Sequence, residues 1–222
     1  MPFSQDTLDF LFENKLNDSR DWFHEHHDTY EKVVVAPLKA LAAELEPVML
    51  EMDPMIITSP RRVLSRINRD IRFTHDKSLY RSNMWLTFGR DKHQFGGVPC
   101  FYFEIGLYGF SYGCGYYQMP PEVLATVREL IKRDDPSFRK AYEAYRAQNV
   151  FELYGDMYKK SKHPEYPPEL RLWLDRKNFG FGAESDDFEM LYSDRLGEFL
   201  CERLKLLEAP YELMLKAVST AI

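Results

Sequence analysis

Apolar side chains recur every three to four residues through the first fifty positions, a spacing typical of amphipathic helices. The first such run covers residues 4–16. A turn at 17–19 then restarts the pattern, in which Pro37 and Pro47 should kink or break the helix. We therefore predict a helical N-terminal part over residues 1–52, with its second helix bent or segmented.

The middle of the chain, residues 60–118, has the pattern of strands. Apolar and charged residues alternate beyond Pro60, which predicts a strand with one charged face. Segments 83–89 and 100–118 are rich in aromatic and β-branched residues, and glycines interrupt the second of them. We predict a sheet-rich part with bends or bulges at those glycines. The apolar face of the first strand would consist of Val63, Ile67, Ile71 and Phe73.

The last part of the chain, residues 119–222, returns to helical spacing. It includes a short predicted strand near 178–183 and a long predicted helix at 188–207, which precedes the C-terminal helix. No repeat or long linker divides the chain. The fold predicted for residues 1–222 is a single α+β domain, in which N-terminal and C-terminal helices flank a central, largely antiparallel sheet.

Charge and composition narrow the class of protein. The 222 residues contain 29 Lys and Arg against 35 Asp and Glu, a net charge of −6, which disfavours a nucleic-acid partner for the surface as a whole. No apolar run approaches the roughly 18 residues of a membrane span, and the first residues do not resemble a signal peptide. We therefore expect a cytoplasmic protein with no membrane partner. The odd cysteine count of three, without a C-x-x-C pair, indicates neither a disulfide framework nor structural zinc.

Positive charge is concentrated at residues 61–81, where the net charge is +5. Such a local excess in an acidic protein should attract an anion, and guanidinium groups suit bidentate contacts with phosphate or carboxylate. Strand alternation places Arg69 on the apolar face, where an unpaired charge is costly to bury. Arg69 therefore needs a partner, which is either a ligand or a carboxylate of the protein. In the second case the segment is a structural Arg-Asp network. The basic residues are Arg61, Arg62, Arg66, Arg69, Arg72, Lys77 and Arg81, and the acidic ones are Asp70 and Asp76.

The sequence RINRDIRFTHDKSLYR at 66–81 resembles the signature of the family known as domain of unknown function 2461. Leu79 departs from that pattern, because the family usually has proline there. Further matches extend the resemblance over nearly the whole chain, at Arg20, Trp22, Phe23, Tyr30 and Pro37 near the N-terminus and at Leu174 and Lys177 later. The resemblance implies no particular reaction. The signature positions are Arg66, Arg69, Asp70, Arg72, Phe73, Thr74, Asp76, Lys77, Tyr80 and Arg81.

Other constellations are weaker. His24 and Asp28 have the i, i+4 spacing of a metal-binding helix, but the second histidine of the H-E-x-x-H motif is missing, so we predict a solvated helix face and no metal. Cys100 and Cys114 are interpreted as small buried side chains. The aromatic residues between 102 and 117 either form core or provide a stacking surface for a ligand.

The leading hypothesis from the sequence is that the protein binds a small anionic ligand, phosphate- or carboxylate-bearing. The predicted ligand-binding residues are Arg66, Arg69, Arg72, Lys77, Tyr80 and Arg81. If the protein is an enzyme, Asp70 or Asp76 is the candidate general base. The alternatives are a noncatalytic module that binds an acidic protein or single-stranded nucleic acid, and a purely structural Arg-Asp network. The sequence assigns no cofactor and no oligomeric state.

Overall fold

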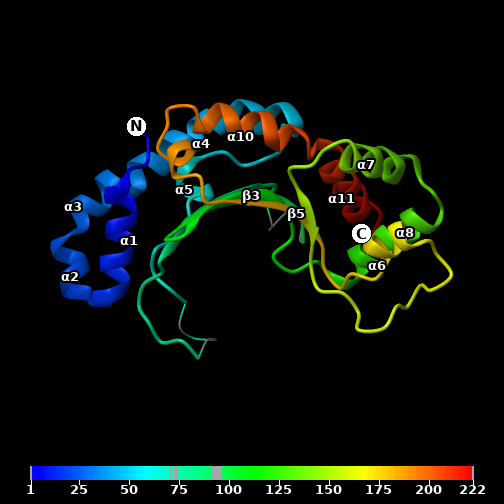
Figure 1. Cartoon of the computed structure of the whole chain (residues 1–222), viewed down its shortest axis with the longest axis horizontal. Coiled ribbons are helices and arrows are strands. Elements are labelled where there is room, and N and C mark those ends of the chain that lie inside the picture. Colours follow the sequence, from blue (N-terminus) through cyan, green and yellow to red (C-terminus); the bar gives the residue numbers. More distant parts are fainter. Residues whose placement is uncertain (1, 71, 73–74, 92–96, 222) are drawn as a thin grey trace. The chain divides into compact units, whose positions relative to one another are not determined.

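The computed structural model describes residues 2–70, 72, 75–91 and 97–221 (Figure 1), and it confirms the α+β class. Ile71, Phe73 and Thr74, which belong to the predicted strand or to the family signature, lie outside the described residues. The chain forms two compact units. The first consists of Met1–Phe88, Tyr102–Tyr112 and Glu184–Cys201, and the second of Gly89–Phe101, Gly113–Ala183 and Glu202–Ile222. The single-domain organisation stays a prediction.

Helices make up the N-terminal part of the first unit, as the apolar spacing predicts. Pro37 does not break the second helical stretch, because the backbone and a neighbouring side chain adjust to it. The preceding residues form a π-helical turn in which Ala36 N–H donates to Glu31 O, and the buried Thr7 hydroxyl donates to Val33 O at 2.7 Å. In a regular helix the N–H of residue 37 would donate to the Val33 carbonyl. Proline has no N–H, so the Thr7 hydroxyl supplies the missing donor. These elements are α1 (Gln5–Asn17), α2 (Arg20–Glu25), α3 (His27–Tyr30), η1 (Glu31–Val35) and α4 (Ala36–Met52).

Five strands form one antiparallel sheet within the described residues, in the order β1-β2-β3-β5-β4. The predicted strand beyond Pro60 is wrong over the described residues 60–70, since residues 60–63 form the short helix α5 (Pro60–Val63) and residues 64–70 form no strand. Leu64 and Asn68 pair with Leu86 of β1 and with Tyr80 only as isolated bridges. The strand β4 has no counterpart in the sequence prediction. The strands are β1 (Asn83–Gly89), β2 (Cys100–Gly106), β3 (Gly109–Gly115), β4 (Glu152–Tyr154) and β5 (Gly180–Ser185).

In the first unit, α4 and α10 (Leu196–Lys205) cover one face of the sheet (Figure 1). Buried and half-buried residues alternate along β1 and β2, so each strand has one core face and one open face. Phe103 stacks on Phe3 with 5.9 Å between the ring centroids, and Tyr112 contacts Phe199 of α10 at 5.8 Å. Each such aromatic side chain stabilises the fold by about 1.5–3 kcal/mol on full burial. The core thus fixes one face of the sheet and leaves the other face available.

The second unit has an aromatic core centred on Trp173, which is buried. Its ring lies 5.5 Å from those of Phe138 and Phe181 and 5.7 Å from that of Tyr145, measured between centroids. The C-terminal helix packs against α6 and α7. The helices of this part are α6 (Pro121–Lys132), α7 (Pro136–Arg146), α8 (Pro168–Leu174) and α11 (Glu208–Ala221).

The long helix predicted at 188–207 is two helices, α9 (Phe188–Leu191) and α10. Ser193 explains the break, because its hydroxyl donates to Met190 O and accepts from Arg195 N–H, and these bonds compete with the helical pattern. Throughout the described ranges, no helix combines the length and apolar character needed to cross a membrane.

Candidate functional site

The family signature segment is held in place by contacts with the N-terminal helices, all within the first unit. Asp18 ends α1 with a left-handed φ of 46°, a conformation that aspartate tolerates. Its carboxylate accepts hydrogen bonds from the backbone N–H groups of Leu79 and Tyr80, at 2.7 and 3.1 Å. Leu79 stands where the family pattern usually has proline, which has no N–H to donate. The departure from the pattern therefore supplies one of the two hydrogen bonds that fix this segment.

Tyr80, a predicted ligand-binding residue, lies in the core. Its side chain is 3% exposed and stacks on Phe23 of α2 with 4.8 Å between the ring centroids. Burial raises the pKa of its hydroxyl. The packing of Tyr80 indicates that it positions the segment.

The charged residues of the segment pair with one another. Arg72 donates to both carboxylate oxygens of Asp70, from Nε at 2.9 Å and from a terminal nitrogen at 2.7 Å. These hydrogen bonds lower the pKa of the Asp70 carboxyl to about 2, although the pair is exposed.

Arg69 contacts Asp76 at 2.9 Å, and Lys15 of α1 lies 3.9 Å from the same carboxylate. A hydrogen bond from the Ser78 backbone N–H is the main cause of the lowered pKa of Asp76. With lowered pKa values, both carboxylates are weak bases at neutral pH.

The remaining predicted ligand-binding residues are Arg66, Lys77 and Arg81. Arg66 and Lys77 are exposed. The Arg81 guanidinium lies over the Trp85 ring, 4.8 Å from its centroid, on the half-buried part of β1. The structure therefore does not gather the six predicted residues around one space.

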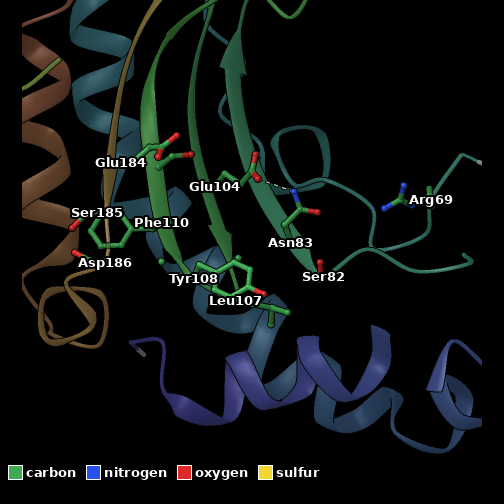
Figure 2. A pocket seen from close by; sticks show the side chains of 13 residues that line it. Arg69, Ser82, Asn83, Glu104, Leu107, Tyr108, Phe110, Glu184, Ser185 and Asp186 are labelled. Atoms are coloured by element: carbon green, nitrogen blue, oxygen red, sulfur yellow. Dashed lines mark hydrogen bonds between the residues drawn. The ribbon is translucent and has the colours of Figure 1, made fainter. Parts of the chain in front are cut away.

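A cavity of about 710 Å³ lies on the open face of the sheet in the first unit (Figure 2). Strands β1, β2, β3 and β5 contribute to its lining, as does the loop that carries Arg69. Gly109, the first residue of β3, borders it with a φ of 136°, and a Cβ at this position would collide with the Ser185 carbonyl oxygen, so only glycine fits there. Its polar lining includes Arg69, Asn83, Glu104, Ser111, Glu184 and Asp186.

The polar lining follows from strand register. The two-residue turn between β2 and β3 sets Glu104 opposite Ser111. Gly113 of β3 lies against Gly182 of β5. Two residues farther along these antiparallel strands, on the same face, are Ser111 and Glu184. Figure 2 shows Glu184 and Glu104 side by side across the sheet.

Asn83 and Arg69 complete the polar lining on the side of β1. Asn83 of β1 donates from its amide to Glu104 Oε1 at 2.7 Å, which joins the first two strands across the open face. Arg69 comes from the loop beyond β1 (Figure 2). Its side chain is 27% exposed, and within the described part of the chain its buried Nε has no hydrogen-bond partner.

Arg69 is the one predicted ligand-binding residue that lines this cavity. The sequence analysis missed Asn83, Glu104, Glu184 and Asp186. A signal was present for Glu104, since it is the single charged residue in the aromatic strand CFYFEIG and alternation puts it on the face opposite Phe103 and Ile105. No comparable signal marks Asp186, which follows the end of β5.

The other candidates from the sequence lie elsewhere. Burial raises the pKa of the Cys100 thiol to about 11, and it also raises that of Cys114. Both thiols are therefore protonated at neutral pH and weakly nucleophilic. Among the residues that the structure describes, no cluster of three or more His, Cys, Asp or Glu side chains could hold a metal ion.

Comparison with known families adds one finding. The family model described as "Conserved hypothetical protein (DUF2461)" matches residues 6–212, and the chain belongs to this family. No curated protein matches the chain. The family description carries no activity, so any function must be argued from the site.

Proposed function

We propose that this member of the DUF2461 family binds a small anionic ligand, a phosphate- or carboxylate-bearing metabolite, in the cavity on the open sheet face. Arg69 contacts the acidic group of the ligand. Of the ligand-binding residues predicted from the sequence, Arg66, Arg72, Lys77, Tyr80 and Arg81 have no place in this cavity. We assign no reaction, and the expected cytoplasmic location is part of the proposal.

The observation that carries the proposal is the state of the Arg69 side chain. A guanidinium has five N–H donors, and the contact with Asp76 is made through one terminal nitrogen. Arg69 lines the cavity and its side chain is 27% exposed, so its remaining terminal N–H groups can donate to an acidic group of the ligand. Its Nε atom is buried and has no acceptor among the described residues.

The size of the cavity supports a small molecule as the ligand. Sites for small molecules measure roughly 300–1,000 Å³, and this cavity of about 710 Å³ falls within that range. The Arg69–Asp76 pair also fits the structural network considered from the sequence. The two functions differ in what the loss of Arg69 should do, because a structural role changes stability and a binding role changes affinity.

The test measures ligand binding by the purified chain and two arginine variants. A thermal-shift screen at low salt would cover nucleotides, sugar phosphates and dicarboxylates, and isothermal titration would follow each hit. A ligand that binds the folded state stabilises it by about 2.7 kcal/mol at a hundredfold excess over Kd. We expect Arg69→Ala to lose this stabilisation and Arg72→Ala, whose arginine pairs with Asp70 outside the cavity, to retain it.

Arg69→Lys separates loss of charge from loss of shape. Because lysine keeps the charge without the fork of donors, this variant should bind weakly but measurably. Wild-type affinity in a folded Arg69→Ala protein would contradict the proposal. A panel without any hit, combined with marked destabilisation of Arg69→Ala, would favour the structural network.

A further inference from the structure

The second unit gathers positive charge around one tyrosine. The ammonium group of Lys162 lies over the Tyr158 ring, 4.1 Å from its centroid, and that of Lys177 lies 6.0 Å from it. The Arg128 guanidinium lies 5.5 Å from the same centroid and donates to the Tyr158 hydroxyl at 3.3 Å. All four residues belong to the second unit. We call this group the Tyr158 cluster, and it brings three formal positive charges to one side chain.

Backbone hydrogen bonds bring two members of the cluster together. After β4 the chain runs antiparallel to residues 175–177 and forms an isolated bridge with them. The Tyr158 N–H donates to Asp175 O at 2.9 Å, and the Lys177 N–H donates to Asp156 O at 2.7 Å. These bonds hold Lys177 alongside Tyr158.

The other two cations are also held by contacts with the protein. Arg128 of α6 donates from Nε to Leu174 O at 3.0 Å and from a terminal nitrogen to Arg176 O at 2.7 Å. The buried carboxylate of Asp175 accepts from the Lys162 backbone N–H at 2.9 Å, which fixes the loop that carries this lysine. The cluster is therefore preorganised, so a ligand would find the cations already in place.

The protein does not neutralise these three charges. Among the described residues, no carboxylate lies within 4 Å of the charged groups of Arg128, Lys162 and Lys177. Attraction to a tyrosine ring is weak at an exposed site, and each cation also repels the other two. The hydrogen bond from Arg128, together with the charges of Arg128 and Lys162, lowers the pKa of the Tyr158 hydroxyl. The cluster is thus a region of positive potential that an anion would stabilise.

We propose that the Tyr158 cluster binds a phosphate group of a small molecule, at a site separate from the cavity of the first unit. A phosphate monoester carries a charge of about −1.5 to −2 at neutral pH and has three acceptor oxygens, so it can accept from all three cations. A carboxylate has a single charge and two oxygens, and it would leave more of the positive charge without a partner.

The arrangement of the cluster favours a compact ligand. Its cations converge on one ring and do not form a stripe along the surface, as contacts to successive phosphates of a nucleic acid would require. The site is independent of the proposed function, because no residue of the Tyr158 cluster lines the cavity that contains Arg69.

The experiment measures phosphate binding by the full chain, as wild type and with Arg69→Ala, which removes the guanidinium of the first cavity. Isothermal titration at pH 7 and low salt gives Kd for inorganic phosphate, pyrophosphate and glycerol 3-phosphate, with acetate and malate as carboxylate probes. In both proteins we expect at least one phosphate probe to bind about tenfold more tightly than either carboxylate, the effect of one added charged hydrogen bond. Amide NMR shifts of the wild type should be large at Tyr158, Lys162 and Lys177.

Lysine variants locate the phosphate contact. Lys162→Gln and Lys177→Gln each remove one charge from an exposed side chain and should weaken phosphate binding about tenfold. Lys140→Gln is the matched control, because it removes an exposed lysine of the second unit whose ammonium already pairs with Glu212 at 2.6 Å. It should bind like the wild type. Urea unfolding verifies that the three variants are folded.

The outcomes separate this site from the cavity of the first unit. Phosphate affinity unchanged in both Lys162→Gln and Lys177→Gln, or reduced equally in Lys140→Gln, would overturn the proposal. Binding that disappears in Arg69→Ala, with shifts confined to the first unit, would overturn it and leave the proposed function in place. Binding retained in Arg69→Ala and weakened in the two cluster variants would support it, whether or not the cavity binds a ligand.

A single-stranded oligonucleotide tests the choice of a small molecule. If the oligonucleotide bound far more tightly than every small phosphate, and lost this affinity in Lys162→Gln, the ligand would be a nucleic acid and the proposal would be overturned. Absence of binding by every phosphate probe would also overturn it.

Discussion

The arginine-rich segment at 61–81 and the cavity on the sheet face use charge in opposite ways. In the segment, Arg72 binds Asp70 and Arg69 contacts Asp76, so both acidic residues and two of the seven basic residues are paired with one another. On the sheet face, charges are few, but Glu104 and Glu184 have no cation of the protein beside them among the described residues. Under the proposed function, the ligand site is marked by charge left without a partner, and not by the density of charge along the chain.

The two regions also differ in what fixes them. The segment is fixed by contacts that do not involve its own charged side chains, namely the hydrogen bonds to Asp18 and the stacking of Tyr80 on Phe23. The cavity is fixed by strand register, because the open face of β2 and β3 is determined once the opposite face is buried. Substitutions in the segment test this division between support and binding.

Removal of the Tyr80 ring should have the largest effect. Tyr80→Ala deletes a buried aromatic side chain and should lower the free energy of unfolding by about 3–5 kcal/mol. Tyr80→Phe keeps the ring and its stacking on Phe23, and should lower it by less than about 1.5 kcal/mol. Urea unfolding of the two variants measures both values. A Tyr80→Ala protein as stable as the wild type would show that the segment is supported in some other way.

Asp18 should have an intermediate effect. Asp18→Ala removes the acceptor of two backbone N–H groups and puts alanine at a left-handed φ, so stability should fall by about 1–3 kcal/mol. Asp18→Asn is the matched control, since asparagine retains an acceptor oxygen and tolerates this φ. Chemical unfolding distinguishes the two. If both substitutions were neutral, the hydrogen bonds at Leu79 and Tyr80 would not be what holds the segment.

The exposed Asp70–Arg72 pair should have the smallest effect. The hydrogen bonds from Arg72 lower the pKa of Asp70 from 3.8 to about 2. A lowered pKa in the folded state means that the contribution to stability is present above about pH 4 and is lost as the pH falls through about 2. Because the pair is exposed, Asp70→Asn should change stability at pH 7 only slightly.

An NMR titration of the Asp70 carboxyl checks this prediction. Its midpoint should lie near pH 2 in the wild type and should move toward 3.8 in Arg72→Ala. A wild-type midpoint close to 3.8 would show that the two side chains do not form the bidentate pair in solution.

Sequence periodicity was enough to predict the fold class, because burial follows spacing in helices and in most of the strands. It could not predict α5, where proline and two arginines begin a short helix at the expected start of a strand. It also missed β4, whose three residues are too few to show a period. The break between α9 and α10 depends on the hydrogen bonds of a single serine side chain, Ser193.

The candidate site was predictable at one residue. Arg69 was selected because a charge on an apolar face needs a partner, and it does line the cavity. Glu104 on β2 and Glu184 on β5 are about eighty positions apart in the chain, and only the order of the strands brings them to the same face. A local charge pattern does not predict strand order, so the acidic residues of the lining were not predicted.

The most direct test of the central claim is to locate the bound ligand by NMR. The backbone amides of the isotope-labelled chain are followed while the tightest probe of the screen is added. We predict the largest shifts at Arg69 and at the cavity residues Asn83, Glu104, Ser111 and Glu184, with little change at Arg66 and Arg72. Shifts concentrated at Arg66 and Arg72, with the cavity residues unmoved, would contradict the account.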